Sequence, residues 1–96
     1  MNKYETMFVL NANLDEETLN STIESINGIL TSNGANVLDT AKWGKKELAY
    51  EIKKNSEGIY VLINFEANPA LIKELERVYR ITDEVIKFIV VRKDEV

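Results

Sequence analysis

Residues 59–67 are apolar on both faces of a predicted strand, and this pattern restricts the folds open to the chain. Successive side chains of a strand point to opposite sides of a sheet, so alternate residues share a face. One face carries Ile59, Val61, Ile63 and Phe65, and the other carries Tyr60 and Leu62. A strand that is apolar on both faces is typical of the middle of a sheet. The sequence therefore predicts that residues 59–67 form a central strand.

Two segments have apolar residues at helical spacing. The first helix is predicted to begin after Asp15, which can cap it, and to end at Asn33 and Gly34, with Gly34 in the left-handed conformation. Gly28 lies inside this helix, and we expect it to allow close approach to the sheet. The buried stripe of the first helix is predicted to be Leu19, Ile23, Ile26 and Leu30.

The second helix is predicted to be capped by Asn68, with Pro69 in its first turn. Strands are predicted at residues 4–10, 35–53, 59–67 and 85–92, with a turn at residues 54–58. The order β-α-β-β-α-β favours an α+β fold, the ferredoxin-like βαββαβ sandwich, with a four-stranded antiparallel sheet and two helices on one face. The first and third strands are expected at its centre, and residues 1–96 are expected to form a single domain.

The sheet face away from the helices is expected to remain open. Met7, Val9, Tyr60 and Leu62 are predicted to lie on it. These residues make the face unusually apolar for a surface in contact with water.

The composition excludes the commonest catalytic groups. The chain has no cysteine and no histidine, so it offers no thiolate, no imidazole base and no zinc site of the usual kind. No apolar run is long enough to cross a membrane, and there is no signal peptide, so we expect a soluble cytoplasmic protein. The net charge is −4, yet residues 41–56 carry five lysines against two acids. This basic island is a candidate surface for a polyanion or a partner protein.

The alternation of apolar residues changes phase inside this island. Trp43 follows the odd-numbered pattern, whereas Leu48, Tyr50 and Ile52 are even-numbered, and Gly44 stands between the two sets. A glycine at such a break is typical of a β-bulge or kink. The lysines beside it fit either an edge strand protected against pairing or a surface that binds a partner.

The island carries a resemblance to a known family. Gly44, a basic residue at Lys46, the tripeptide Leu48-Ala49-Tyr50 and Ile52 match the signature of the bacterial small-subunit ribosomal protein S6 family. The resemblance extends over nearly the whole chain, from the first strand to Val90-Val91-Arg92. It departs from the family at position 2, where many members have arginine and this chain has Asn2.

The resemblance implies a structural constituent of the small ribosomal subunit, located on the ribosome, without catalysis and without a cofactor, metal or small-molecule substrate. It implies binding to small-subunit ribosomal RNA together with ribosomal protein S18. Lys87 and Arg92 match basic positions of the family's last strand, and Lys3 stands near its N-terminal basic position, so the resemblance implies RNA phosphate contacts for these three residues.

We assign Trp43, Lys45, Lys46 and Tyr50, which lie at or near the strand break, to a protein-partner surface on the second strand. Each of these could equally be a solvated charge or a core aromatic, and Tyr50 could point inward.

Two other functions are compatible with the fold. One is a ferredoxin-like regulatory or ligand-binding module that acts as a homodimer and binds a metabolite on the open face. The other is an RNA-recognition-like module, which fits less well because Glu57 and Ile59 occupy positions where a basic residue and an aromatic are expected.

Overall fold

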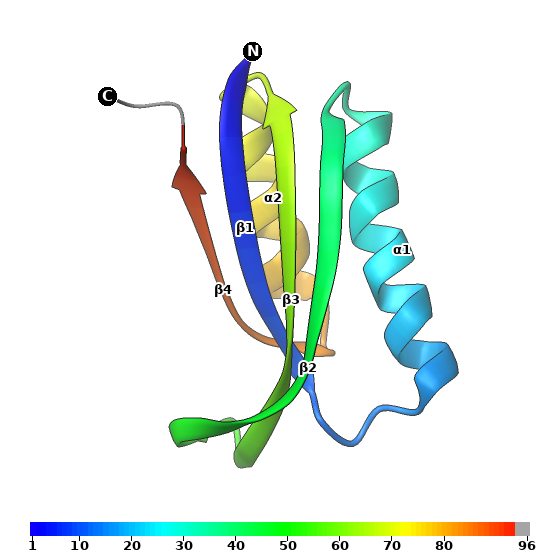
Figure 1. Ribbon diagram of the computed structural model, residues 1–96, viewed down its shortest axis with the longest axis vertical. Helices are drawn as coiled ribbons and strands as arrows, with labels where there is room; N and C mark the ends of the chain where they lie inside the picture. The colour runs from blue at the N-terminus through cyan, green and yellow to red at the C-terminus, as the bar shows by residue number, and fades with distance from the viewer. Residues whose placement is uncertain (94–96) are drawn as a thin grey trace.

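The computed structural model describes residues 1–93, which form a four-stranded antiparallel sheet and two helices in the predicted order (Figure 1). The elements are β1 (Asn2–Asn11), α1 (Glu16–Ser32), β2 (Asn36–Ile52), β3 (Asn55–Ala67), α2 (Ala70–Ile81) and β4 (Val85–Arg92). The strand order is β2-β3-β1-β4, so β1 and β3 are central. The predicted ferredoxin-like fold is confirmed.

The main core lies between the sheet and the two helices. β3 pairs with β1 on one side and with β2 on the other, and its Val61, Ile63 and Phe65 are fully buried against the helices. The α1 stripe enters the same core through Leu19, Ile26 and Leu30. The third strand, β3, is therefore central, as the apolar residues on its two faces predicted.

The helix ends follow the predicted caps. The Asp15 carboxylate accepts a hydrogen bond from the Thr18 amide at 3.0 Å, which lowers the pKa of Asp15. Gly34 has a φ of +87°, as expected for the left-handed residue after a helix. At α2, the Asn68 side chain accepts from the Ala70 amide at 3.0 Å. Gly28 differs from its prediction, because it is exposed and a Cβ built there meets nothing within 4 Å.

A buried polar pair connects β1 to α2. The Thr6 hydroxyl donates to the Ile89 carbonyl at 3.0 Å, and the Tyr79 hydroxyl lies 2.9 Å from the same Thr6 oxygen. Burial raises the pKa of Tyr79, and the hydrogen bond with Thr6 opposes that rise. Tyr79 is thus a core residue with a satisfied hydroxyl.

The turn between β2 and β3 is not at residues 54–58 as predicted. Lys53 and Lys54 have φ angles of 48° and 66°, and the flanking Ile52 and Asn55 pair with each other. Two central residues with positive φ are the mark of a tight hairpin turn. The side-chain amide of Asn55 stabilises this turn by donating hydrogen bonds to the Ile52 and Lys53 carbonyls at 3.3 and 3.0 Å. The residues with typical turn chemistry, Asn55 to Gly58, belong to β3 instead.

The face away from the helices is only partly open, which corrects the prediction for Val9. The β2–β3 hairpin curls at its tip (Figure 1), and Leu48 from the hairpin packs on Val9 and Ile86. Ile52 and Tyr60 pack against this second core, and Val9 is buried to 1% exposure. The second core therefore joins residues from all four strands on the face away from the helices.

Gly58 is expected to be indispensable to the second core. A Cβ at this position would collide with Val9 Cγ1 and would lie 3.5 Å from Leu48 Cδ2. Val9 is buried and β-branched, so it has little freedom to move. We expect Gly58→Ala to lower the free energy of unfolding by about 1–3 kcal/mol, as overpacking does.

Gly28→Ala is the matched control, because it makes the same change in an exposed helix position. It is expected to raise stability by about 0.5–1 kcal/mol. Urea unfolding of both variants provides the measurement. Equal effects of the two substitutions would contradict the close packing at Gly58.

Candidate nucleic-acid and partner interface

The break in β2 lies at Gly44, as predicted. Lys42 pairs with Val61 and Gly44 pairs with Tyr60, so Trp43 is an extra residue in β2. Gly44 has a φ of +89°, which favours glycine. Trp43 is 54% exposed, and the Lys46 ammonium lies 6.0 Å from the centre of its ring. The bulge therefore presents an indole and a lysine together at the surface.

Lys45 and Lys46 are both exposed, but they belong to different faces of the sheet. Lys45 pairs with Ile59, which faces the helices, whereas Lys46 pairs with Gly58 beside the second core. The structure thus groups Trp43 with Lys46 and sets Lys45 apart from them.

Tyr50 lies on the part of β2 where pairing is irregular. Glu47 pairs with Glu57 and Ile52 pairs with Asn55, so residues 48–51 stand opposite Ser56 alone. Leu48 anchors this stretch in the second core, while Tyr50 is 64% exposed. The inward orientation considered for Tyr50 is therefore wrong.

The curl of the hairpin brings Tyr50 to the last strand. The Lys87 ammonium lies 5.7 Å from the centre of the Tyr50 ring. Lys87 is exposed and pairs with Val9, so it lies on the face away from the helices. A residue expected to contact RNA and one expected to contact a partner protein thus touch each other, and the sequence pattern offered no signal for this contact.

The other two predicted RNA-binding residues lie apart from Lys87. Lys3 shares its face of the sheet but stands six residues from Val9 along β1, a distance of about 20 Å. Arg92 pairs with Tyr4, which faces the helices, and its guanidinium donates to the Asn2 side chain at 3.3 Å. The three cations are therefore spread along β1 and β4 and do not form one cluster.

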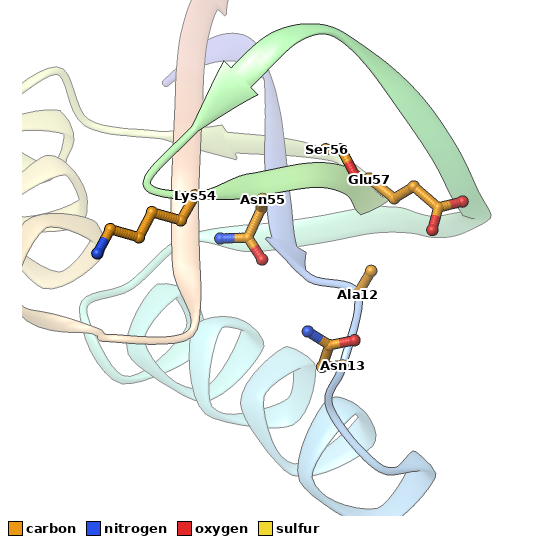
Figure 2. Close-up of a pocket in the computed structure, with 6 residues that line it drawn as sticks. All are labelled: Ala12, Asn13, Lys54, Asn55, Ser56 and Glu57. Atoms are coloured by element: carbon orange, nitrogen blue, oxygen red, sulfur yellow. The ribbon is translucent and has the colours of Figure 1, made fainter.

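The residues that line two small cavities do not form a ligand-binding site. One of about 100 Å³ lies between the β1–α1 loop and the hairpin, and Figure 2 shows that Lys54 and Glu57 extend in opposite directions from it. Another of about 220 Å³ between α1 and the α2–β4 turn has Glu84 as its one charged residue. Within residues 1–93 no group of three or more acidic side chains could hold a metal ion. Of the two helices in this range, neither is long and apolar enough to cross a bilayer.

The fold and this site define a ferredoxin-like protein whose candidate site is an exposed strand hairpin and sheet face, not an enclosed pocket. The family model for ribosomal protein S6 matches residues 3–92. The chain belongs to the ribosomal protein S6 family of the small ribosomal subunit. Its expected location, the ribosome in the cytoplasm, is confirmed by this membership.

Relatives match over nearly their full length. The small ribosomal subunit protein bS6 of Clostridium beijerinckii is 52% identical over 93 residues, which are 97% of this chain and 98% of the relative. The bS6 protein of Caldanaerobacter subterraneus is 45% identical over 95 residues, covering 99% of this chain and all of the relative. The crystal structure of ribosomal protein S6 from Thermotoga maritima superposes with a TM-score of 0.92 at 32% identity, covering 96% of this chain and 87% of that one.

Proposed function

We propose that this chain is a structural, non-catalytic component of the small ribosomal subunit that binds ribosomal RNA jointly with ribosomal protein S18. Family membership supports the ribosomal part of the proposal, since the relatives are named as small-subunit proteins. The absence of cysteine and histidine from the chain is consistent with a role without catalysis.

One observation carries the proposal of joint recognition. Lys87, a candidate RNA contact, lies against Tyr50 of the hairpin that we assign to the partner. A phosphate at Lys87 and a protein at the hairpin would therefore be neighbours. The two ligands would share a boundary along the Tyr50–Lys87 contact.

The net charge of this chain supports a proposal in which both proteins contribute cations to RNA binding. The chain has a net charge of −4, and its candidate cations are spread along two strands. Phosphate contacts supply most of the affinity of a protein for RNA, and each neutralised phosphate adds to the salt dependence of binding. A partner that contributes further positive charge would complete an RNA-facing surface that this chain alone provides only in part.

Two sets of variants are expected to separate the two surfaces. For RNA binding by the heterodimer, a plot of log K against the logarithm of the salt concentration gives a slope. Arg92→Ala is expected to reduce the size of this slope by about one. The Lys45→Ala/Lys46→Ala double variant is expected to raise the dissociation constant of the heterodimer instead, because these lysines flank the Trp43 bulge. Lys73→Ala on an exposed face of α2 is the control and is expected to change neither quantity.

Lys87→Ala is expected to change both quantities, because Lys87 contacts Tyr50 and also faces solvent. RNA titrations at several salt concentrations and calorimetry of heterodimer formation provide the measurements. If the Lys45/Lys46 variant lowers the salt slope while Arg92→Ala and Lys87→Ala leave it unchanged, the assignment of the two surfaces is wrong.

A further inference from the structure

A stack of aromatic rings runs from the main core to the helix side of β4 and ends at an arginine. The ring centres of Phe8 and Tyr79 are 5.2 Å apart, and those of Tyr79 and Phe88 are 5.0 Å apart with an interplanar angle of 28°. Phe8 and Tyr79 are buried, whereas Phe88 is half-buried. The Arg80 guanidinium lies over the Phe88 ring, 5.8 Å from its centre. The stack therefore leads from the core to a cation at the surface.

Arg80 is held in position from two sides. Its guanidinium is attracted to the face of the Phe88 ring, and the Glu76 carboxylate, one turn earlier in α2, lies 3.9 Å from Arg80 Nη2. The Arg80 side chain is nevertheless 64% exposed. A planar group that is oriented before a ligand arrives loses little conformational freedom on binding. Arg80 thus presents a pre-oriented guanidinium plane to the solvent.

A second arginine of α2 lacks this arrangement. Arg77 is also exposed, and its guanidinium donates to the Glu74 carboxylate at 2.8 and 2.7 Å. Within residues 1–93 its guanidinium lies over no aromatic ring. The two arginines therefore share a helix and a carboxylate partner, and they differ in the ring beneath Arg80.

Arg80 lies on the same side of β4 as Arg92, a candidate phosphate contact. Phe88 pairs with Phe8 and Arg92 pairs with Tyr4, and both of these partners belong to the main core beneath the helices. Phe88 and Arg92 are four residues apart along β4, a distance of about 13 Å. Because β4 is an outer strand of the sheet, a nucleic-acid segment that follows its free edge can contact both arginines.

A nucleobase suits Arg80 better than a phosphate does. The Glu76 carboxylate beside the guanidinium would repel a phosphate that approached the same group. Unpaired RNA bases stack on aromatic side chains and on guanidinium planes, and this stacking does not require an uncompensated positive charge. The exposed plane of Arg80 therefore favours a base.

We propose that Arg80, oriented by Phe88 and Glu76, is a stacking site for an unpaired nucleobase of the small-subunit ribosomal RNA. This inference rests on the proposed function and adds a base contact to the phosphate contacts at Lys87 and Arg92. Because every base has a face that can stack, the site recognises an unpaired nucleotide and not a particular base.

Arg80→Lys tests the site in the heterodimer with S18, because it keeps the charge and removes the plane. We expect the dissociation constant for RNA to rise by about tenfold, as for the loss of one stacked base, while the salt slope stays unchanged. Arg77→Lys is the matched control, and we expect it to change RNA binding by less than about twofold. The dissociation constant of the heterodimer itself is expected to stay the same for both variants, which separates an RNA contact from a structural role.

Abasic substitutions in the RNA separate a base contact from a phosphate contact. Each unpaired nucleotide of a small-subunit RNA fragment is replaced in turn by an abasic nucleotide, which keeps the phosphate and lacks the base. We expect one position at which this change weakens binding of the wild-type heterodimer by about tenfold. At that position the Arg80→Lys heterodimer is expected to lose less than about twofold, because the contact is already absent.

The possible outcomes separate this inference from the proposed function. If the wild-type heterodimer does not bind the RNA fragment, the proposed function and this inference both fail. If it binds and the Arg80→Lys heterodimer binds equally tightly, only this inference fails. If Arg80→Lys weakens binding but every abasic change has the same effect on both heterodimers, Arg80 contacts no base and the inference is wrong.

Discussion

Leu30→Ala is expected to lower the free energy of unfolding by about 2–5 kcal/mol, the range for a buried leucine. Leu30 is fully buried at the end of the α1 stripe, in the main core with Ile26 and Leu19. Its carbonyl accepts from the Ala35 amide at 2.9 Å, so the residue also lies where α1 turns into β2. The cavity left by truncation would weaken both the core and this connection.

Glu24→Ala provides the control in the same helix, because Glu24 is exposed. It is expected to change stability by no more than about 0.5 kcal/mol. For a domain of this size each kcal/mol corresponds to a shift of about 4–8 °C in Tm, so thermal unfolding resolves the two variants. An unchanged Tm for Leu30→Ala would contradict the placement of α1 on the sheet.

The fold could be predicted because its main signals are local. Residues 59–63 are apolar on both faces, and this pattern indicated a central strand, which β3 is. The last strand has the predicted bounds, Val85–Arg92, because only Lys87 interrupts the apolar residues of its sequence and Asp83 and Glu84 precede it. Gly44 marked the bulge correctly, since a change in the alternation must be absorbed by an extra residue.

The position of the hairpin turn and the role of Gly58 depended on tertiary structure and could not be predicted from the sequence. Two lysines with positive φ form the hairpin turn, although the neighbouring Asn55, Ser56 and Gly58 have the usual turn chemistry. Gly58 is needed because Val9 occupies the space of its Cβ, a contact between strands that local periodicity cannot reveal.

The candidate site was less predictable than the fold for the same reason. The sequence selected Lys87 and Tyr50 as separate candidates, and only the curl of the hairpin brings them within 5.7 Å. Arg92 and Lys87 were grouped because both match basic positions of the family's last strand, but their cross-strand partners Tyr4 and Val9 show that they face opposite sides.

Joint RNA recognition is expected to produce a large difference in affinity between the isolated chain and the heterodimer. The isolated chain has a net charge of −4. A phosphate bound at Lys87 and a second phosphate bound at Arg92 would lie on opposite faces of β4. Few simultaneous phosphate contacts give weak binding that salt removes readily. With S18 bound at the hairpin, the RNA would meet cations of both proteins on one surface.

The most direct test is a titration of a small-subunit ribosomal RNA fragment with this chain alone, with S18 alone and with the equimolar mixture, at one moderate salt concentration. Joint recognition predicts tight, saturable binding for the mixture and weak binding for each protein alone. Tight and specific binding by this chain without S18 would contradict joint recognition, and so would a mixture that binds no better than the stronger of the two proteins.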